Sequence, residues 1–265
     1  MKQQLQQITN KSLRFGYHKF TILYTRLKYY KFKSNHIFKI NVDDINFKMS
    51  FADYKLQGAI VQRIEGKREK DTVAIIKSIV HDGSKVLELG GCYGYFTLIM
   101  SKCVGPSGRV VSIEGTPNNY TILCNNLQLN EINNVDTYNL FLTKASEFAT
   151  FSPYDKSPYD AINRLKTKSE DATVKVTTVH LGSFLNQINY KPDYVFMDIE
   201  GFEVDAIESL SDSHFPINKP IIVFETHPAF YQKEKGLDYI INILETHQYR
   251  YRQIGDNLIC FPITI

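Results

Sequence analysis

The pattern of apolar positions along the chain changes at Lys85. Beyond this residue, short continuous runs rich in Val, Ile and Leu alternate with stretches whose apolar residues recur at helical spacing. Continuous runs are typical of strands buried on both faces, and the stretches between them are typical of helices that cover a sheet. We therefore predict an α/β fold with a mostly parallel sheet. The expected strands are KVLEL, RVVSIE, VDTYNL, VKVTTV, DYVFMDI and PIIVFET.

Turn signals predict a small β-hairpin before this pattern and another at its end. HIFKINV and INFKMSF flank Asp43 and Asp44, and YRYRQI and LICFPI flank the turn sequence GDN. Helices are expected over residues 71–80, 95–103, 118–129, 182–187 and 203–210.

The chain is expected to have three regions. Residues 1–35 would form a basic, aromatic-rich helical extension, residues 36–80 a hairpin and a linking helix, and residues 81–265 the main domain. Within the main domain, residues 144–171 are polar and contain Pro153 and Pro158, so we expect a long loop there. Long loops of compact domains are often functional lids.

Charge is distributed unevenly along the chain. Residues 1–35 carry eight Lys and Arg side chains and no acidic one, whereas the remainder is acidic overall. Aromatic and basic residues interleave in this extension, which would suit either an anionic membrane surface or packing on the main domain. No apolar run is long enough to cross a bilayer, and the pattern of a signal peptide is absent. We expect a cytoplasmic protein, with peripheral contact at the inner membrane face as an open alternative.

The first expected strand, KVLEL, ends in a glycine-rich segment that should hold a ligand. A phosphate-binding P-loop would need a lysine after the glycines, and a dinucleotide fingerprint would need glycine where Leu89 stands. What remains is Glu88 near the strand end, followed by Gly90 and Gly94. These glycines would let the backbone approach a ligand, and the carboxylate could receive an ammonium group. The pattern favours a cationic ligand without phosphate, such as S-adenosylmethionine.

A second acidic residue supports this ligand. Glu114 ends the next strand, at the spacing from which a carboxylate accepts both hydroxyls of an adenosine ribose. Asn139 and Phe141, at the end of the third strand, could flank the adenine or simply pack there. Solvated strand ends remain the alternative for Glu88 and Glu114.

Several segments together carry a family resemblance: VLELGGCYGYFTLIM, VVSIEGTPNNYTILCNNLQLN, VTTVHLGSFL, DYVFMDIEGFEVDAI and PIIVFETHPAF. In this order and spacing they resemble the FkbM family of S-adenosylmethionine-dependent methyltransferases over residues 71–265. MDIEGFE is the most specific part, because many class I methyltransferases share the glycine loop. The chain departs from the family pattern at Glu88, where aspartate is usual, and at Gly-Gly-Cys, which replaces the commoner Gly-Ala-Asn.

The resemblance implies a Rossmann-like class I methyltransferase fold with a mostly parallel seven-stranded sheet and an antiparallel C-terminal strand. It also implies O-methylation, commonly of sugars or of natural-product hydroxyls. The donor S-adenosylmethionine would contact the glycine loop and the neighbouring strand ends. The candidate donor-binding residues are Glu88, Gly90, Gly91, Tyr93, Gly94, Glu114, Asn139 and Asp198.

The acceptor site is expected beside the donor, at the carboxyl edge of the sheet. Asp198 and Glu200 share one side of a strand end by period two, and Glu225 and His227 do the same on its neighbour, so these groups could converge. His227 is the candidate general base, because an ordinary histidine pKa of about 6.5 allows proton uptake at neutral pH, with Glu225 as its orienting partner. A capping or packing role for His227 stays open.

The three catalytic candidates are also suitable metal ligands. Asp198, Glu225 and His227 could hold a magnesium or manganese ion that acidifies the acceptor hydroxyl. Glu203 and Asp205 are assigned instead to the start of a helix, where acidic side chains favour the helix dipole.

Other functions are weaker candidates. Nucleic-acid amino-methyltransferases carry two adjacent prolines where this chain has MDIEG, so no nucleic-acid substrate is expected. Intact Glu88, Gly90, Gly94 and Glu114 argue against a non-catalytic membrane-associated module, and Leu89 argues against a nicotinamide oxidoreductase. We expect an O-methyltransferase acting on a sugar or glycan hydroxyl in surface polysaccharide or glycolipid biosynthesis. A small natural product is the alternative acceptor, and the oligomeric state is not indicated.

Overall fold

The computed structural model divides the chain into two compact units, residues 1–70 and residues 71–265, and each is described by itself. The structure describes residues 36–51, 59–142, 148–151, 174–213, 215, 218–231 and 234–263. The basic extension, residues 1–35, and most of segment 144–171 lie outside the described residues, so the membrane hypothesis stays a prediction. The boundary between the two units along the sequence lies after Lys70, and the sequence pattern suggested a main domain that starts after Val80.

The first unit contains the hairpin that the turn signal predicts. Strand β1 (Phe38–Val42) pairs antiparallel with β2 (Ile45–Met49) across the turn at Asp43 and Asp44. Buried and exposed side chains alternate along both strands, as expected of strands with one solvated face. A short helix, α2 (Ala59–Ile64), follows the hairpin and is absent from the predicted elements.

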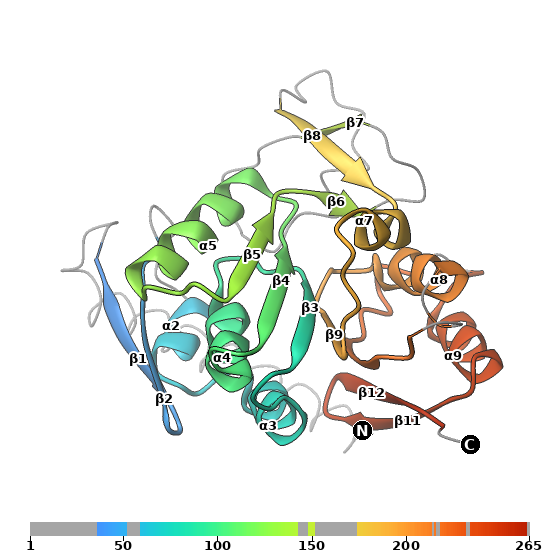
Figure 1. The fold of residues 1–265 in the computed structure, drawn as a ribbon, viewed down its shortest axis with the longest axis horizontal. Coiled ribbons are helices and arrows are strands. Elements are labelled where there is room, and N and C mark those ends of the chain that lie inside the picture. Colours follow the sequence, from blue (N-terminus) through green and yellow to red (C-terminus); the bar gives the residue numbers. More distant parts are fainter. Residues whose placement is uncertain are drawn as a thin grey trace, which may run out of the picture. The chain divides into compact units, whose positions relative to one another are not determined.

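The second unit is built on a seven-stranded sheet in the order β11-β12-β10-β9-β3-β4-β5 (Figure 1). Neighbouring strands pair in parallel except at β12, which is antiparallel to both β10 and β11. This sheet confirms the predicted fold class, including the antiparallel C-terminal strand. The strands are β3 (Lys85–Leu89), β4 (Arg109–Ile113), β5 (Val135–Tyr138), β9 (Tyr194–Met197), β10 (Ile221–Glu225), β11 (Tyr249–Ile254) and β12 (Asn257–Pro262).

Helices flank this sheet on two sides, with α4 and α5 on one side and α7, α8 and α9 on the other (Figure 1). The crossovers from β3 to β4 and from β4 to β5 use α4 and α5. Right-handed connections place both helices on the same face when the strand order runs in one direction. The helices are α3 (Lys70–Ile79), α4 (Tyr95–Val104), α5 (Pro117–Leu129), α7 (Leu181–Gln187), α8 (Glu203–Ser213) and α9 (Leu237–Thr246).

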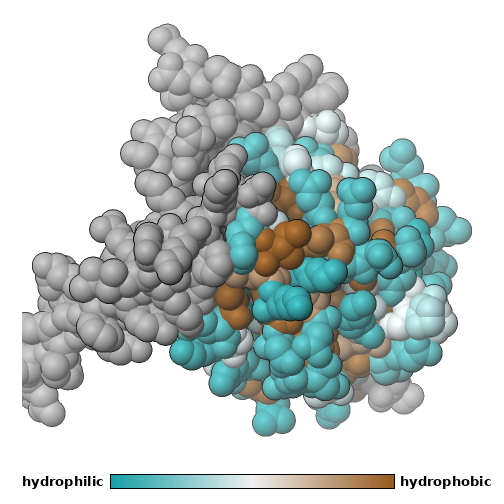
Figure 2. All heavy atoms as spheres, turned by 90° about the vertical axis from the view of Figure 1, so that its left-hand side faces the viewer, coloured by the Kyte–Doolittle hydropathy of each residue, from teal (hydrophilic) through white to brown (hydrophobic). Residues whose placement is uncertain are grey.

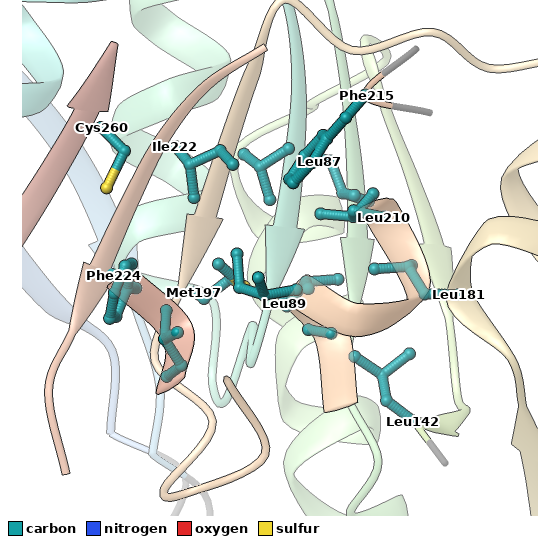
Figure 3. Packing of buried hydrophobic residues seen from close by; sticks show 14 of the residues in the cluster. Leu87, Leu89, Leu142, Leu181, Met197, Leu210, Phe215, Ile222, Phe224 and Cys260 are labelled. Carbon is teal, nitrogen blue, oxygen red and sulfur yellow. The ribbon is translucent and has the colours of Figure 1, made fainter. Parts of the chain in front are cut away.

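A hydrophobic core packs the strands against α7, α8 and α9. Leu87 and Leu89 of β3, Met197 of β9 and Phe224 of β10 contribute from the sheet, and Leu210 contributes from α8 (Figure 3). Each of these side chains is at most 3% exposed, and burial of a side chain of this size contributes about 1.5–3 kcal/mol. The core thus fixes the ends of β3, β9 and β10, which carry the candidate site.

The described surface is mainly polar. On the face shown in Figure 2, hydrophilic residues dominate and small hydrophobic areas lie among them. Ile37 and Tyr251 are among the large apolar side chains that are exposed in the described part of the chain. Among the described helices, none has the length and apolar character needed to cross a membrane.

Several elements differ from the sequence-based expectation. VKVTTV forms β8 (Val174–Val179), which pairs with β6 (Phe141–Leu142) and β7 (Phe148–Phe151) in a separate sheet rather than in the main one. Strand β7 lies within the segment predicted as a loop, because its pairing with β8 is a long-range contact that local sequence does not encode. Helix α9 was not predicted, since a short run rich in Ile and Leu suits a buried strand as well as a helix.

Candidate functional site

The candidate residues meet at the carboxyl edge of the sheet, between β3 and β9. These neighbours pair in parallel, with Leu89 opposite Met197. After β3 the sheet continues through β4 and β5 on one side, and β9 and β10 lie on the other. Open α/β sheets bind ligands at such a reversal of strand order. The glycine segment follows β3 at this point, and Asp198 follows β9.

Gly90 brings these two strand ends into close contact. The amide of Asp198 donates a hydrogen bond to the carbonyl oxygen of Leu89 over 3.1 Å. Gly90 has a φ of 93°, and a Cβ at this position would overlap the backbone oxygen of Asp198. A side chain is therefore excluded by the left-handed backbone and by the protein itself. The sequence pattern suggested that Gly90 lets a ligand approach, and in the structure it also makes room for Asp198.

The rest of the glycine segment packs against neighbouring elements. A Cβ on Gly91 would overlap Ser112 Oγ, and a Cβ on Gly94 would lie 2.8 Å from Leu123 Cδ1. The Tyr93 side chain is only 1% exposed, so its ring lies in the interior and only its backbone remains to reach a ligand. The Tyr93 carbonyl oxygen accepts a hydrogen bond from Asn126 Nδ2 over 2.8 Å.

Glu88 is a buried carboxylate beside this segment. Its Oε2 accepts hydrogen bonds from Thr97 Oγ1 over 2.5 Å and from Ser112 Oγ over 2.6 Å. Burial raises the pKa of Glu88 to about 7 despite these two hydroxyls, and the charges of Glu114 and Asp198 act in the same direction as burial. The carboxyl therefore keeps its proton to a higher pH than an exposed glutamate does, and a cationic ligand beside it would favour the charged form.

Glu114 connects the glycine segment to the end of β4. Its Oε2 accepts a hydrogen bond from the amide of Cys92 over 2.8 Å, and its Oε1 accepts one from the amide of Thr116 over 2.7 Å. Burial raises the pKa of Glu114, and these amides partly offset the effect. Asn139 Nδ2 donates to the carbonyl oxygens of Glu114 and Gly115 over 2.8 and 3.0 Å. The side chains of Thr116 and Asn119 also donate hydrogen bonds to Glu114, so this carboxylate is held by several neighbours and fixes the glycine segment to the end of β4.

A narrow cleft of about 30 Å³ lies at this edge of the sheet, so it can take one end of a ligand and not a whole adenosyl ligand. Its lining includes Glu88, Gly90, Phe96, Asp198 and Glu225. Carboxylates from β3, from the end of β10 and from the residue after β9 therefore share one wall, which favours a ligand with positive charge. The cleft brings together three of the predicted donor-site residues, Glu88, Gly90 and Asp198.

Three carboxylates surround His227, which follows β10. Its Nδ1 lies 2.9 Å from Glu203 Oε1. Its Nε2 lies 3.6 Å from Asp198 Oδ1 and 3.9 Å from Glu200 Oε2. The imidazole is 11% exposed, so the ring is largely enclosed while its Nε2 side faces two carboxylates. We call Asp198, Glu200, Glu203 and His227 the His227 cluster.

The orienting partner predicted for His227 is wrong. Glu225 lines the cleft, and the closest carboxylate to the ring is Glu203 of α8. Period-two alternation holds only within a strand, and β10 ends at Glu225. Glu200 and Gly201, both with positive φ, form a turn that leads directly into α8. This turn places Glu203, the first residue of α8, beside the imidazole of His227.

The carboxylates change the expected chemistry of His227. Burial lowers the pKa of the ring, but the hydrogen bond to Glu203 and the charges of Glu203, Asp198 and Glu200 outweigh it and raise the pKa to about 9. Without a bound cation the ring is therefore protonated at neutral pH and has no lone pair to accept a proton. The carboxylates thus raise the pKa of His227 above the ordinary value that the sequence suggested.

Part of the His227 cluster has the composition of a cation site. Among the described residues, one carboxylate oxygen each from Asp198 and Glu200 and one ring nitrogen of His227 lie within 4.8 Å of one another. Oxygen and imidazole ligands of this kind suit Mg²⁺ or Mn²⁺. The predicted set of Asp198, Glu225 and His227 is therefore corrected in one member, because the geometry brings Glu200 into the group in place of Glu225.

Comparison with known proteins shows to which family the chain belongs. The profile of the Methyltransferase FkbM domain matches residues 81–251. The chain belongs to the FkbM family of methyltransferases. This match confirms the resemblance seen in the sequence, and the FkbM domain is an S-adenosylmethionine-dependent methyltransferase domain of class I.

Individual relatives are distant. Methyltransferase 1 of Beauveria bassiana (strain ARSEF 2860) is 24% identical over 161 residues, which make up 54% of this chain and 64% of that protein. The 23S rRNA (uracil(1939)-C(5))-methyltransferase RlmD of Acinetobacter baylyi is 33% identical over 101 residues, or 38% of this chain and 21% of that protein. The chain thus spans less than two thirds of the length of either relative. The solved O-methyltransferase from Bacillus cereus in complex with SAH is 15% identical, with a TM-score of 0.45 over 72% of this chain and 79% of that chain.

Sequence reasoning missed some members of the FkbM site. Glu203 lies in the signature MDIEGFE, so a signal was present, but its position at a helix start suggested a dipole role. Thr97 and Ser112, which hold Glu88, carry no motif signal. Their role becomes visible only when α4 and β4 bring both hydroxyls to the same carboxylate.

Proposed function

We propose that the FkbM domain transfers a methyl group from S-adenosylmethionine to a hydroxyl group of a sugar or glycan. One observation supports the place of transfer: Asp198 belongs both to the cleft and to the His227 cluster. A donor bound along the glycine segment, with its charged end at the cleft, would present its methyl group beside that cluster. The acidic wall supports a cationic donor, and the sugar acceptor rests on the family resemblance. A hydroxyl of a small natural product is the alternative acceptor.

The transfer is an in-line displacement. The acceptor oxygen forms a bond to the methyl carbon while the bond from that carbon to sulfur breaks, and the hydroxyl loses its proton. In this proposal the proton passes to Asp198, the carboxylate that the cleft and the cluster share. Protonated His227 stays paired with Glu203 and attracts Asp198 and Glu200 from its other side. The products are S-adenosylhomocysteine and a methyl ether.

A divalent cation gives the second form of the proposal. The observation that favours it is the convergence of ligand atoms from Asp198, Glu200 and His227. When bound, Mg²⁺ or Mn²⁺ would take the place of the proton on the histidine and lower the pKa of a neighbouring hydroxyl. Glu225 lines the cleft, and it has the same role with and without a bound cation.

Transfer of labelled methyl groups tests the proposal. Labelled S-adenosylmethionine is supplied with sugars and oligosaccharides, hydroxylated natural products and RNA, and each reaction is run with a chelator and with added Mg²⁺ or Mn²⁺. We expect label in the sugar class, and we expect Asp198→Asn to lower kcat by about 100-fold or more at saturating donor. Asp205→Asn, which changes an acid of α8 outside the cleft and the cluster, is the matched control.

The outcomes of this assay distinguish the acceptor class and the need for a cation. Label found only in RNA, or absent from every acceptor although the donor binds, contradicts hydroxyl methylation of sugars. Label in natural products alone selects the alternative acceptor. Activity that is lost on chelation and restored by Mg²⁺ or Mn²⁺ selects the cation form, and unchanged activity selects direct proton transfer to Asp198.

A further inference from the structure

Glu203 is a buried acid whose burial the helix dipole does not explain. Its side chain is 0% exposed, although it is the first residue of α8. A partly solvated carboxylate would interact with the helix dipole as well, and Asp205 in the same turn is only partly buried. Burying a carboxylate costs free energy unless hydrogen bonds and opposite charge compensate. Glu203 therefore requires a specific partner in the interior.

That partner is the imidazole of His227. Glu203 Oε1 lies 2.9 Å from Nδ1 of the ring and also accepts a hydrogen bond from the amide of Gly201 over 3.2 Å. The hydroxyl of Tyr231 accepts a hydrogen bond from the amide of His227 over 3.1 Å and is itself hydrogen-bonded to Glu203. Tyr231 therefore supports both the backbone of His227 and the carboxylate of Glu203, and the hydrogen bond from Nδ1 to Glu203 sets the direction of the ring.

The two ring nitrogens face different groups. Nδ1 faces Glu203, and Nε2 faces Asp198 at 3.6 Å and Glu200 at 3.9 Å. A ring turned over would lose the hydrogen bond to Glu203. The partner of one imidazole nitrogen generally determines what the other nitrogen presents to a site.

We propose that Glu203 is a positioning residue of the FkbM domain: it accepts the Nδ1 proton of His227 and thereby directs Nε2 toward Asp198 and Glu200. The inference deepens the proposed function and rests on it, because Asp198 defines the place of transfer. Both forms of that function need this orientation, either to pair Nε2 with the two carboxylates or to offer it to a cation. If Glu203 served only the helix dipole, Glu203 and Asp205 would be equivalent.

Nuclear magnetic resonance of the isotope-labelled full chain tests the hydrogen bond directly. The Nδ1 proton of His227, assigned by its loss in His227→Asn, is expected to give a downfield signal. Glu203→Leu should abolish this signal, and Glu203→Gln, which keeps an acceptor oxygen without the charge, should retain it at a shifted position. Asp205→Asn should leave it unchanged. A signal that is the same in the wild type and in Glu203→Gln overturns the proposal, even if Glu203→Leu does not fold.

Methyl-transfer kinetics supply the functional readout. Glu203→Leu should lower kcat roughly 10- to 100-fold while the donor Kd changes little, and Glu203→Gln should recover part of the loss. Asp205→Asn should keep wild-type kcat. Equal effects of the Glu203 and Asp205 variants overturn the positioning role. If the Nδ1 signal behaves as expected but no hydroxyl is methylated, the proposed function fails and the positioning role of Glu203 stands. If a hydroxyl is methylated but the Nδ1 signal does not depend on Glu203, the positioning role fails and the proposed function stands.

Discussion

At the scale of single residues, Glu88 is a buried carboxyl that lines the cleft. Its side chain is 4% exposed, and the hydroxyls of Thr97 and Ser112 are bound to one of its oxygens. Burial nevertheless raises its pKa from 4.5 to about 7. Between these two pH values the folded protein holds a proton that the unfolded chain releases.

The stability of the protein should therefore fall as the pH rises from about 4.5 to about 7, by on the order of 3 kcal/mol from Glu88 alone. The sign follows because the folded state binds more protons than the unfolded state in this range. Glu88→Gln cannot ionise and should lose this part of the pH dependence. Urea unfolding at pH values below and above the range measures the slope, with the exposed Glu245→Gln as control. Equal slopes in the wild type and Glu88→Gln would show that burial does not raise the pKa of Glu88.

His227 shows how far the sequence predicts a site at this scale. Its place just after a strand was enough to predict that it reaches the carboxyl edge near Asp198, and the structure brings the two within 3.6 Å. Its raised pKa depends on carboxylates from the turn after β9 and from α8. These residues approach the ring only in the folded chain, so the spacing of Glu225 and His227 suggested the wrong partner.

At the scale of elements, α5 holds the glycine segment in place. Asn126 of this helix is fully buried, and its Nδ2 donates to the carbonyl oxygen of Tyr93 over 2.8 Å. Leu123, one turn earlier, packs against Gly94. The segment that lines the donor cleft therefore takes part of its conformation from a helix beyond the next strand.

Asn126→Ala should weaken both the fold and donor binding. It leaves the buried carbonyl of Tyr93 without this donor, which costs about 1–3 kcal/mol of stability. Because the carbonyl belongs to the glycine segment, the affinity for S-adenosylmethionine should fall as well. Thermal unfolding and calorimetric titration measure the two effects, and Gln128→Ala, exposed on the same helix, is the control. Destabilisation with unchanged donor affinity would mean that α5 supports the core and not the cleft.

Elements were predictable from sequence where their pattern is local. The continuous apolar runs of β3, β4, β9 and β10 indicate strands of a buried sheet, and the structure confirms them. The assignment of β8 to that sheet was wrong, because the choice of a partner strand is a long-range property. Its sequence, VKVTTV, interrupts the apolar run with polar residues, which is a signal of a less buried strand that could have separated it from the others.

At the scale of the whole molecule, the site exists because distant segments meet at the reversal of strand order. Glu88 and Glu114 arrive on β3 and just after β4, whereas Asp198 and His227 follow β9 and β10. The order β5-β4-β3-β9-β10 is what places the donor cleft beside the His227 cluster. We therefore propose that one edge of this sheet binds S-adenosylmethionine and presents its methyl group to that cluster.

Calorimetric titration of the full chain with S-adenosylmethionine, S-adenosylhomocysteine and NAD tests this claim most directly. We predict that both adenosyl ligands bind one site and that NAD does not bind. Glu114→Ala should lose most of the affinity for S-adenosylmethionine, because Glu114 secures the glycine segment through the amide of Cys92, whereas Glu245→Gln should keep it. Binding of NAD in preference to S-adenosylmethionine, or binding of neither adenosyl ligand, would contradict the account.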